Sequence, residues 1–462
     1  MPDGFRHADT FWAEQALLPS GWARNVRLRV VDGRLDEVVA DAPAQPGDAR
    51  LGVIVPGLGN VHSHAFQRAM AGLAEVAGPS GDDFWSWRAL MYRFLDRLQP
   101  EDLEAIAAQA YMEMLESGFT RVGEFHYVHH QADGHAYADP AEMCRRLVAA
   151  AQQSGIGLTL LPVFYAHADF GGQPPAPAQR RMIHRLDGFA RLYEGAGPAI
   201  AALDDGVLGL APHSLRAVTG DELAALLPLT DGPLHIHIAE QQREVEACLA
   251  WSGQRPVQWL FEHIAVDRRW CLVHATHVND AELRAIVASG AVVGLCPVTE
   301  ANLGDGLFPM QAYARAGGRF AVGSDSNVRI DAAEELRLLE YGQRLVARGR
   351  NVLAGPLQSS GRWLYEHAGN GAAQALGVPA GLQEQAFADF LELELNHTSM
   401  VHRVEDSLLD SWLFAGRNCS LRAVWRRGRQ LVHQGRHIHR DAISTRFSAA
   451  IARLQGHRAP QA

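Results

Sequence analysis

The feature that most constrains the fold of this chain is a repeated alternation of short apolar runs with longer stretches of helical periodicity. The predicted helices include residues 102–117, 140–154, 241–251 and 280–289. The eight apolar runs are residues 53–61, 119–125, 158–163, 207–211, 234–239, 270–275, 291–295 and 320–324. Continuous apolar strands separated by helices indicate parallel βαβ units, and eight such units predict a (β/α)8 TIM barrel.

A doubly wound open sheet is the alternative fold. No GxGxxG motif follows the first predicted strand, which weakens a dinucleotide-binding version of that fold. Outside the alternating region, short strands and turns predominate at both ends of the chain. We therefore expect residues 1–55 and 379–462 to form one small β-sandwich-like domain beside a barrel of residues 56–378.

Composition excludes several classes of protein. The formal net charge is −10, and no stripe of basic and aromatic residues is present, so nucleic acid is not an expected partner. No run of about 18 apolar residues exists, so no membrane segment is expected. The N-terminus shows no signal-peptide pattern, and the five cysteines are scattered without CxxC spacing. These features predict a cytoplasmic protein that acts on a small molecule.

Histidines and one aspartate stand where several predicted strands end. His62 and His64 end the first strand, and residues i and i+2 of a strand point to the same side. His237 ends the fifth strand and Asp325 follows the eighth. These strand ends meet at the rim of a barrel where active sites form. Three imidazoles and a carboxylate suit one Zn2+, with iron or manganese as alternatives. We expect His235, which lies deeper on its strand, to be a hydrogen-bonded core residue.

Two further residues extend this group toward catalysis. Glu240 lies three residues after His237, where it can deliver a proton to a leaving nitrogen. The alternative role for Glu240 is a helix-start carboxylate stabilised by the helix dipole. His274 ends the sixth strand, where it can orient a hydroxide and stabilise a tetrahedral intermediate. Asp325 can bind the metal and also accept the proton of the attacking water.

The combined motifs resemble the amidohydrolase superfamily, and specifically its aminohydrolase branch, which deaminates amidines. The segments that carry the resemblance are PGLGNVHSH at 56–64, HIAE at 237–240, His274, GSD at 323–325 and GNGAAQALG at 369–377. The resemblance implies that His62, His64, His237 and Asp325 hold one metal ion. Binuclear members use a carboxylated lysine at the fourth strand, where this chain has LAPH at 210–213, so a single-metal enzyme is expected. The resemblance also implies a homodimer.

Three further segments resemble the N-formimino-L-glutamate deiminases of histidine degradation, which release ammonia and leave N-formyl-L-glutamate. They are HAFQRAMAG at 64–72, DFWSWR at 83–88 and GEFHY at 123–127. A substrate with two carboxylates needs cations, and arginine pairs with carboxylates through a planar fork. Arg88 and Arg216 are the candidates. The alternative for Arg88 is a surface residue stacked on Trp85 and Trp87.

By the same resemblance, Gln67, Tyr127 and His213 complete the substrate site, although each can equally be a hydrogen-bonding residue of the barrel rim. One competing function is a deaminase of the same branch that acts on a purine or a triazine. The other is a barrel that has lost catalysis and serves as a scaffold. The scaffold hypothesis predicts broken metal ligands, whereas the complete set of candidate ligands is present here.

Overall fold

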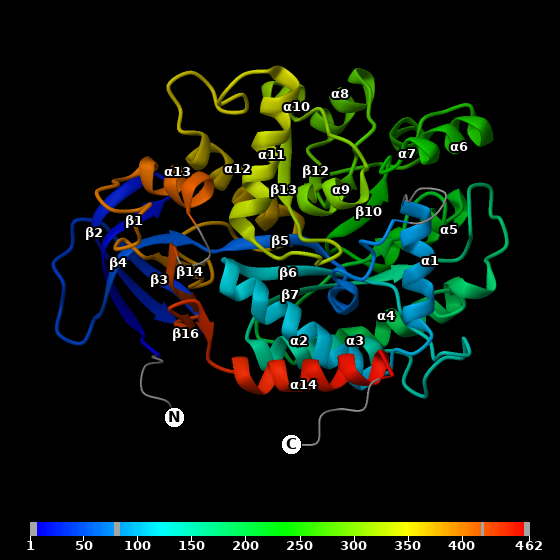
Figure 1. The fold of residues 1–462 in the computed structure, drawn as a ribbon, viewed down its shortest axis with the longest axis horizontal. Coiled ribbons are helices and arrows are strands. Elements are labelled where there is room, and N and C mark those ends of the chain that lie inside the picture. Colours follow the sequence, from blue (N-terminus) through cyan, green and yellow to red (C-terminus); the bar gives the residue numbers. More distant parts are fainter. Residues whose placement is uncertain (1–6, 78–83, 417–419, 457–462) are drawn as a thin grey trace.

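The computed structural model describes residues 7–77, 84–416 and 420–456. Asp83 of the DFWSWR segment and Cys419 lie outside these ranges. A closed barrel of parallel strands fills the middle of the molecule (Figure 1). Its strands are β5 (Leu58–Ser63), β6 (Phe119–His126), β7 (Gly157–Phe164), β8 (Val207–Leu208), β9 (Ala211–Pro212), β10 (Leu234–Ile238), β11 (Trp270–His274), β12 (Val292–Leu295) and β13 (Arg319–Val322).

Single bridges close the ring between the two sheets that make up the barrel. Ser63 pairs with Asp325, and Leu210 pairs with Leu234. The fourth strand is interrupted, so that β8 and β9 together occupy its place beside β7. Gly209 lies between them, where an added Cβ would come 2.6 Å from the carbonyl oxygen of Pro233. The predicted (β/α)8 barrel is confirmed.

The first predicted run, residues 53–61, is divided between two sheets. Its first part belongs to β4 (Ala49–Pro56), and its second part is barrel strand β5. Gly57 separates them and passes so close to β6 that a Cβ there would lie 2.3 Å from Thr120 Oγ1. A continuous apolar run therefore changes sheet at a glycine, which apolar periodicity does not reveal.

Helices connect the strands and cover the barrel, and the four predicted helices that we named are present. The helices are α1 (Phe84–Leu95), α2 (Pro100–Ser117), α3 (Glu142–Ser154), α4 (Leu186–Ile200), α5 (Gly220–Leu226), α6 (Gln242–Ser252), α7 (Pro256–His263), α8 (Asp280–Ser289), α9 (Pro297–Leu303), α10 (Met310–Arg315), α11 (Ala332–Ala347), α12 (Ser360–Ala375), α13 (Asp406–Ala415) and α14 (Arg440–Leu454). None of the helices in the described ranges has the length and apolar character needed to cross a bilayer.

Both ends of the chain contribute to one eight-stranded sheet, which lies to the left of the barrel in Figure 1. Besides β4, its strands are β1 (Thr10–Leu18), β2 (Gly21–Val31), β3 (Arg34–Val39), β14 (Phe390–Leu393), β15 (Leu421–Arg426), β16 (Arg429–His433) and β17 (Arg436–His437). The sheet encloses its own apolar core, where the Phe11 ring lies 5.2 Å from Phe390 and 5.1 Å from Trp425. The sequence correctly predicts that the two termini share a sheet.

The prediction has strands and turns at this end of the chain, so it misses both α13 and the last helix, α14. Helix α14 lies against barrel helix α2, where Ser444 donates a hydrogen bond to Gln109 Oε1 at 3.1 Å. Its buried residues are Ile443, Ala450 and Leu454. Because this apolar stripe is so narrow, the helical period is weak in the sequence.

A buried ion cluster joins the terminal sheet to the barrel. Arg121 of β6 lies 2.7 Å from Asp205 Oδ2, and Arg426 of β15 forms a second ion pair with the same oxygen. Only 6% of the Asp205 side chain is exposed. Burial alone would raise the pKa of Asp205, but the charges of Arg426 and Arg121 lower it to about 2. The folded state therefore favours the ionised carboxylate.

We predict that Asp205→Ala lowers the free energy of unfolding by about 3–5 kcal/mol, because it leaves buried guanidinium groups without their shared partner. The wild-type contribution is fully present above the ordinary carboxyl pKa of 3.8 and is lost as the pH falls toward 2. Urea unfolding from pH 6 to pH 3 measures both effects. The control is Asp204→Ala. This variant removes an ion pair with Arg427, but the Asp204 side chain is 80% exposed. Equal losses in the two variants would contradict the prediction.

Candidate active site

Four predicted ligands from three strand ends meet in one buried group. His62 Nε2 lies 3.2 Å from His64 Nε2 and 3.0 Å from His237 Nε2. Asp325 Oδ1 lies 3.5 Å from His62 Nε2 and 3.3 Å from His64 Nε2. Each of these residues is at most 5% exposed. The four ligand atoms can therefore face a single ion.

Backbone carbonyls fix the orientation of two of these imidazoles. His64 Nδ1–H donates to the carbonyl of Phe125 at 2.8 Å, and His237 Nδ1–H donates to the carbonyl of His213 at 3.0 Å. A carbonyl only accepts, so the proton of each neutral ring is on Nδ1 and the lone pair is on Nε2. The lone pairs of His64 and His237 therefore face His62 Nε2, an arrangement that suits a bound cation.

The ionisation states agree with metal binding. Burial lowers the pKa of His62 to about 3, and burial also lowers the pKa of His64 and of His237. Burial alone would raise the pKa of Asp325, but the adjacent imidazoles lower it below its usual range. Neutral imidazoles and an ionised carboxylate are the forms that bind a divalent cation. The donor set therefore fits the single Zn2+ site that the sequence predicts.

A hydrogen-bond network holds the two ligand-bearing segments together. Asn327 Nδ2 donates to Ser63 Oγ and to the carbonyl of His64, each at 3.1 Å. Ser324 Oγ donates to Asn327 Oδ1 at 2.6 Å and receives a hydrogen bond from Asn60. This network fixes the end of β5 relative to the segment that follows β13, and so fixes the imidazoles of β5 relative to Asp325.

The backbone is strained where the site is formed. His274 has φ 67° and Asp325 has φ 44°, which are left-handed conformations unusual for residues other than glycine. Each such residue costs of order 1–3 kcal/mol, and strain of this kind clusters at functional sites. It turns the two side chains into the barrel mouth.

Glu240 and His274 lie beside the ligand group. His274 Nε2 is 3.8 Å from Glu240 Oε1 and 3.8 Å from Asp325 Oδ2. Burial raises the pKa of Glu240 to about 7. For His274 burial alone would lower the pKa, but the carboxylates of Glu240, Glu300 and Asp325 outweigh it and raise the pKa to about 10. The site therefore contains an acid that titrates near neutrality and a cationic imidazole.

Glu300 is a site residue that the sequence analysis missed. Its Oε1 lies 3.3 Å from His274 Nδ1 and accepts the backbone N–H of Cys296 at 2.8 Å. It fixes His274 with Nε2 toward the pocket. Glu300 lies on α9, outside the HxH, HIAE and GSD motifs, so its only signal was a buried glutamate beside a strand end.

The five predicted substrate residues line one pocket together with the catalytic group. They are Gln67, Arg88, Tyr127, His213 and Arg216. Gln67 Nε2 donates to Tyr127 Oη at 2.8 Å, and Gln67 Oε1 is buried without a partner among the described residues. His235 does not reach this pocket. As predicted, it is a core residue, and its Nε2–H donates to the carbonyl of Ala375 at 2.8 Å.

Arg216 is the residue that most strongly indicates an anionic ligand. It is 5% exposed and lines the pocket, yet in the described part of the chain no carboxylate forms an ion pair with it. Arg88 is half-buried, lines the same pocket, and lies 4.3 Å above the Trp85 ring. Both roles considered for Arg88, stacking and pocket lining, are therefore present together.

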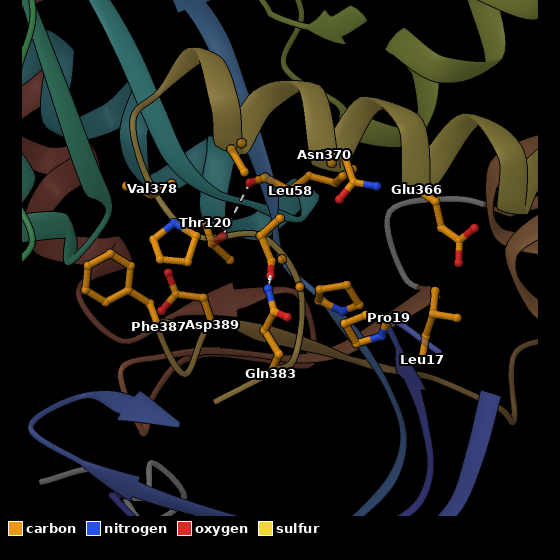
Figure 2. A pocket seen from close by; sticks show the side chains of 18 of the residues that line it. Leu17, Pro19, Leu58, Thr120, Glu366, Asn370, Val378, Gln383, Phe387 and Asp389 are labelled. Atoms are coloured by element: carbon orange, nitrogen blue, oxygen red, sulfur yellow. Dashed lines mark hydrogen bonds between the residues drawn. The ribbon is translucent and has the colours of Figure 1, made fainter. Parts of the chain in front are cut away.

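Another cavity lies away from this site, between the terminal sheet and α12. It has a volume of about 300 Å³, and Figure 2 shows Thr120, Phe387 and Asp389 on its wall. Its buried charges already have protein partners, since Arg121 pairs with Asp205, and Asp389 pairs with Arg426. A pocket of this kind offers a ligand little charge, in contrast to the pocket that contains Arg216.

The complete sequence also bears on the number of metal ions. All 42 basic residues counted as lysine or arginine are arginines, so a carboxylated lysine cannot bridge a second ion anywhere in this chain. The described cysteines, which are Cys144, Cys248, Cys271 and Cys296, are buried free thiols. Two groups of described residues could hold an ion: His62, His64, His237 and Asp325 form one, and His274, Cys296 and Glu300 form the other.

Two family models match the chain. The model described as the amidohydrolase family matches residues 53–431. The model described as the N-terminal domain of the formimidoylglutamate deiminase HutF matches residues 9–52.

Individual relatives agree with these matches. The chain is 52% identical to a formimidoylglutamate deiminase of Pseudomonas aeruginosa over 96% of this chain and 99% of the relative. It is 30% identical to an 8-oxoguanine deaminase of the same organism over 69% of this chain and 71% of the relative. A crystal structure of an amidohydrolase from Brucella melitensis superposes with a TM-score of 0.94, at 51% identity, and covers 97% of this chain and 100% of that chain.

We predict that His237→Ala loses the bound metal, because it removes one of the three imidazoles of a four-ligand site. The control is His213→Ala. This variant keeps the backbone carbonyl that orients His237 and should retain the metal. Elemental analysis after dialysis measures occupancy, with about one ion per chain expected in the wild type. Full occupancy in His237→Ala would remove His237 from the ligand set.

Proposed function

The chain belongs to the amidohydrolase family, and from this membership we propose that it hydrolyses N-formimino-L-glutamate to N-formyl-L-glutamate and ammonia in histidine degradation. The assignment of the substrate rests on Arg216. This arginine is buried, has no carboxylate partner among the described residues, and lines the pocket that contains His237 and Glu240. The name of the Pseudomonas aeruginosa relative and the HutF-type N-terminal segment support the same substrate.

We propose that the cofactor is one Zn2+, with iron or manganese as alternatives, held by His62, His64, His237 and Asp325. The three nitrogens and one oxygen of this group suit zinc. A divalent cation held there lowers the pKa of a water molecule toward neutrality and so supplies the nucleophile.

Side chains of the protein donate and accept the protons that the reaction transfers. Hydrolysis of the amidine forms a C–O bond, breaks a C–N bond and requires a proton on the nitrogen that leaves as ammonia. Glu240 is the group that delivers it, because burial raises its pKa to about 7 and keeps a share of it protonated at neutral pH. Asp325 accepts the proton of the attacking water. His274 stabilises the negative charge that develops at the attacked carbon's oxygen.

The two substrate carboxylates bind the arginines. Arg216, inside the pocket, takes one carboxylate, and Arg88, nearer the solvent, takes the other. Gln67, Tyr127 and His213 provide hydrogen bonds to the remaining polar atoms of the substrate. A purine substrate is the alternative, because an 8-oxoguanine deaminase is among the relatives. Two pocket arginines that lack ion pairs among the described residues favour a dianion over a neutral purine.

We also propose a cytoplasmic homodimer. The cytoplasmic location rests on the free cysteines of the described ranges, which suit a reducing compartment. The homodimer rests on the resemblance to the aminohydrolase branch.

The test of the proposed function is ammonia release from N-formimino-L-glutamate by the purified protein, with bound metal quantified in the same sample. We expect rapid release by protein that holds about one metal ion per chain. A parallel panel contains 8-oxoguanine and other purines. Metal-loaded protein that turns over a purine and leaves N-formimino-L-glutamate intact would overturn the proposal.

We predict that Glu240→Gln retains the metal but lowers kcat by about 10²–10⁴-fold, because glutamine cannot transfer the proton. The matched control is Glu246→Gln, an exposed glutamate of the same segment, which should keep wild-type kcat. Stopped-time ammonia assays at saturating substrate measure both variants. A Glu240→Gln enzyme with near-normal kcat would rule out the proton-transfer role.

A further inference from the structure

Three arginines surround one indole ring, and two of them, Arg88 and Arg216, line the pocket. The guanidinium carbon lies 4.3 Å from the Trp85 ring centroid in Arg88, 4.7 Å in Arg243 and 5.7 Å in Arg216. Arg88 and Trp85 lie on α1, Arg243 lies on the first turn of α6, and Arg216 follows β9. Three segments that are distant in sequence thus bring like charges to one place.

None of these arginines has an ion pair with a carboxylate in the described ranges. Other arginines in the described ranges do form such pairs. Arg255, which precedes α7, lies 2.7 Å from Glu282. Unpaired like charges repel one another, so an arrangement of three is unfavourable unless an anion joins them.

The carboxylates whose charges act most strongly on Arg216 are those of Glu244 and Glu240, and Glu244 already accepts other hydrogen bonds. Glu244 and Glu240 both act to raise the pKa of Arg216, although burial opposes them. Glu244 accepts the backbone N–H groups of Ala239 and Glu240, each at 3.1 Å. Arg216 Nε is buried and has no hydrogen-bond partner among the described residues. No carboxylate of the described residues therefore completes this group, which leaves it free to bind an anion from solution.

We infer that Trp85 and Arg243 belong to the substrate site. Trp85 is a positioning residue that holds three arginines around its ring, and Arg243 is the outermost of them, which captures substrates that carry two carboxylates. This inference rests on the proposed function and extends it, since it assigns the selection of dianions to residues beyond Arg88 and Arg216.

The three arginines lie at different depths. Arg216 is 5% exposed, Arg88 is half-buried and Arg243 is exposed. A dianion that approaches the pocket meets Arg243 first and ends on the two inner arginines. An exposed charge of this kind acts on capture more than on chemistry, through a field that salt screens. The cation–π contact with the indole holds each guanidinium in place.

The alternative is that the stack only supports the fold. In that case removal of Arg243 or Trp85 changes the melting temperature and leaves the capture of substrate unaltered. The binding role and the structural role therefore predict different values of KM, and a different salt dependence of kcat/KM, for these variants.

The first experiment compares Arg243→Gln with the wild type at low salt and at about 1 M NaCl, where the screening length is about 3 Å. We expect kcat/KM for N-formimino-L-glutamate to fall about tenfold at low salt, with unchanged kcat, and the difference to disappear at high salt. Arg243→Lys should recover part of the loss. The control Arg284→Gln removes the same charge from an exposed position on α8 and should match the wild type. Wild-type kcat/KM in Arg243→Gln at low salt, or an equal loss in Arg284→Gln, would overturn the inference.

The second experiment tests Trp85. Trp85→Leu removes the aromatic face, whereas Trp85→Phe keeps one, so we expect a several-fold rise in KM in the first variant and a smaller rise in the second. Melting curves identify any variant that fails to fold, and the Arg243 variants then decide the question. Folded Trp85→Leu with wild-type KM would remove Trp85 from the site.

Binding of glutarate, a dicarboxylate without an amidine, separates this inference from the proposed function. Calorimetry on metal-loaded protein should show binding that weakens in Arg243→Gln and is lost in Arg216→Met, with no binding of the monocarboxylate butyrate. Glutarate binding that depends on Arg243, in a protein that does not release ammonia from N-formimino-L-glutamate, would overturn the proposed function alone. Ammonia release that does not depend on Arg243 would overturn this inference alone.

Discussion

The buried contact among His62, His64, His237 and Asp325 is the constraint on which the rest of the structure depends. The Nε2 atoms of His64 and His237 lie 3.0–3.2 Å from that of His62, a spacing that suits ligands of one cation. Such a group needs strand ends that converge from different parts of the chain. A closed parallel barrel provides that convergence, because the carboxyl ends of its strands share one rim. The geometry of the ligand group therefore requires a fold in which strand ends converge, and the barrel is such a fold.

This constraint has local costs that the structure offsets elsewhere. The left-handed backbone of His274 and Asp325 is unfavourable by itself. The Asn327 network, with hydrogen bonds to Ser63 Oγ and to the His64 carbonyl, holds the strained segment in place. Gly323 contributes in another way, since a Cβ there would come 2.7 Å from the backbone nitrogen of His62. Close approach of two strands is what brings their ligands within reach of one ion.

Periodic and positional signals predicted the barrel, the sheet shared by both termini and the histidines and aspartate at the strand ends. The family resemblance alone suggested Gln67, Tyr127 and His213. Residues at strand ends share a rim, so His237 and Asp325 could be placed together without any knowledge of distance. Glu300 could not be found in this way, because its role depends on the direction of one imidazole nitrogen. The divided run at Gly57 and the sparse apolar stripe of α14 were missed for a related reason. The change of sheet at Gly57 and the position of α14 both depend on contacts with residues distant in sequence, and local periodicity does not report such contacts.

The two ends of the barrel differ in how their charged side chains are paired. At the end that meets the terminal sheet, Asp205 lies between Arg121 and Arg426, so the charges neutralise one another and fix the domains in place. At the mouth, arginines lie around Trp85 without such partners in the described ranges, although the whole chain carries a net charge of −10. Local positive charge on an acidic protein draws a small dianion to one place and leaves the remaining surface unattractive to it. The same residue type therefore stabilises the fold where the chain supplies the carboxylate, and in the proposed function it selects a ligand that supplies the carboxylate itself.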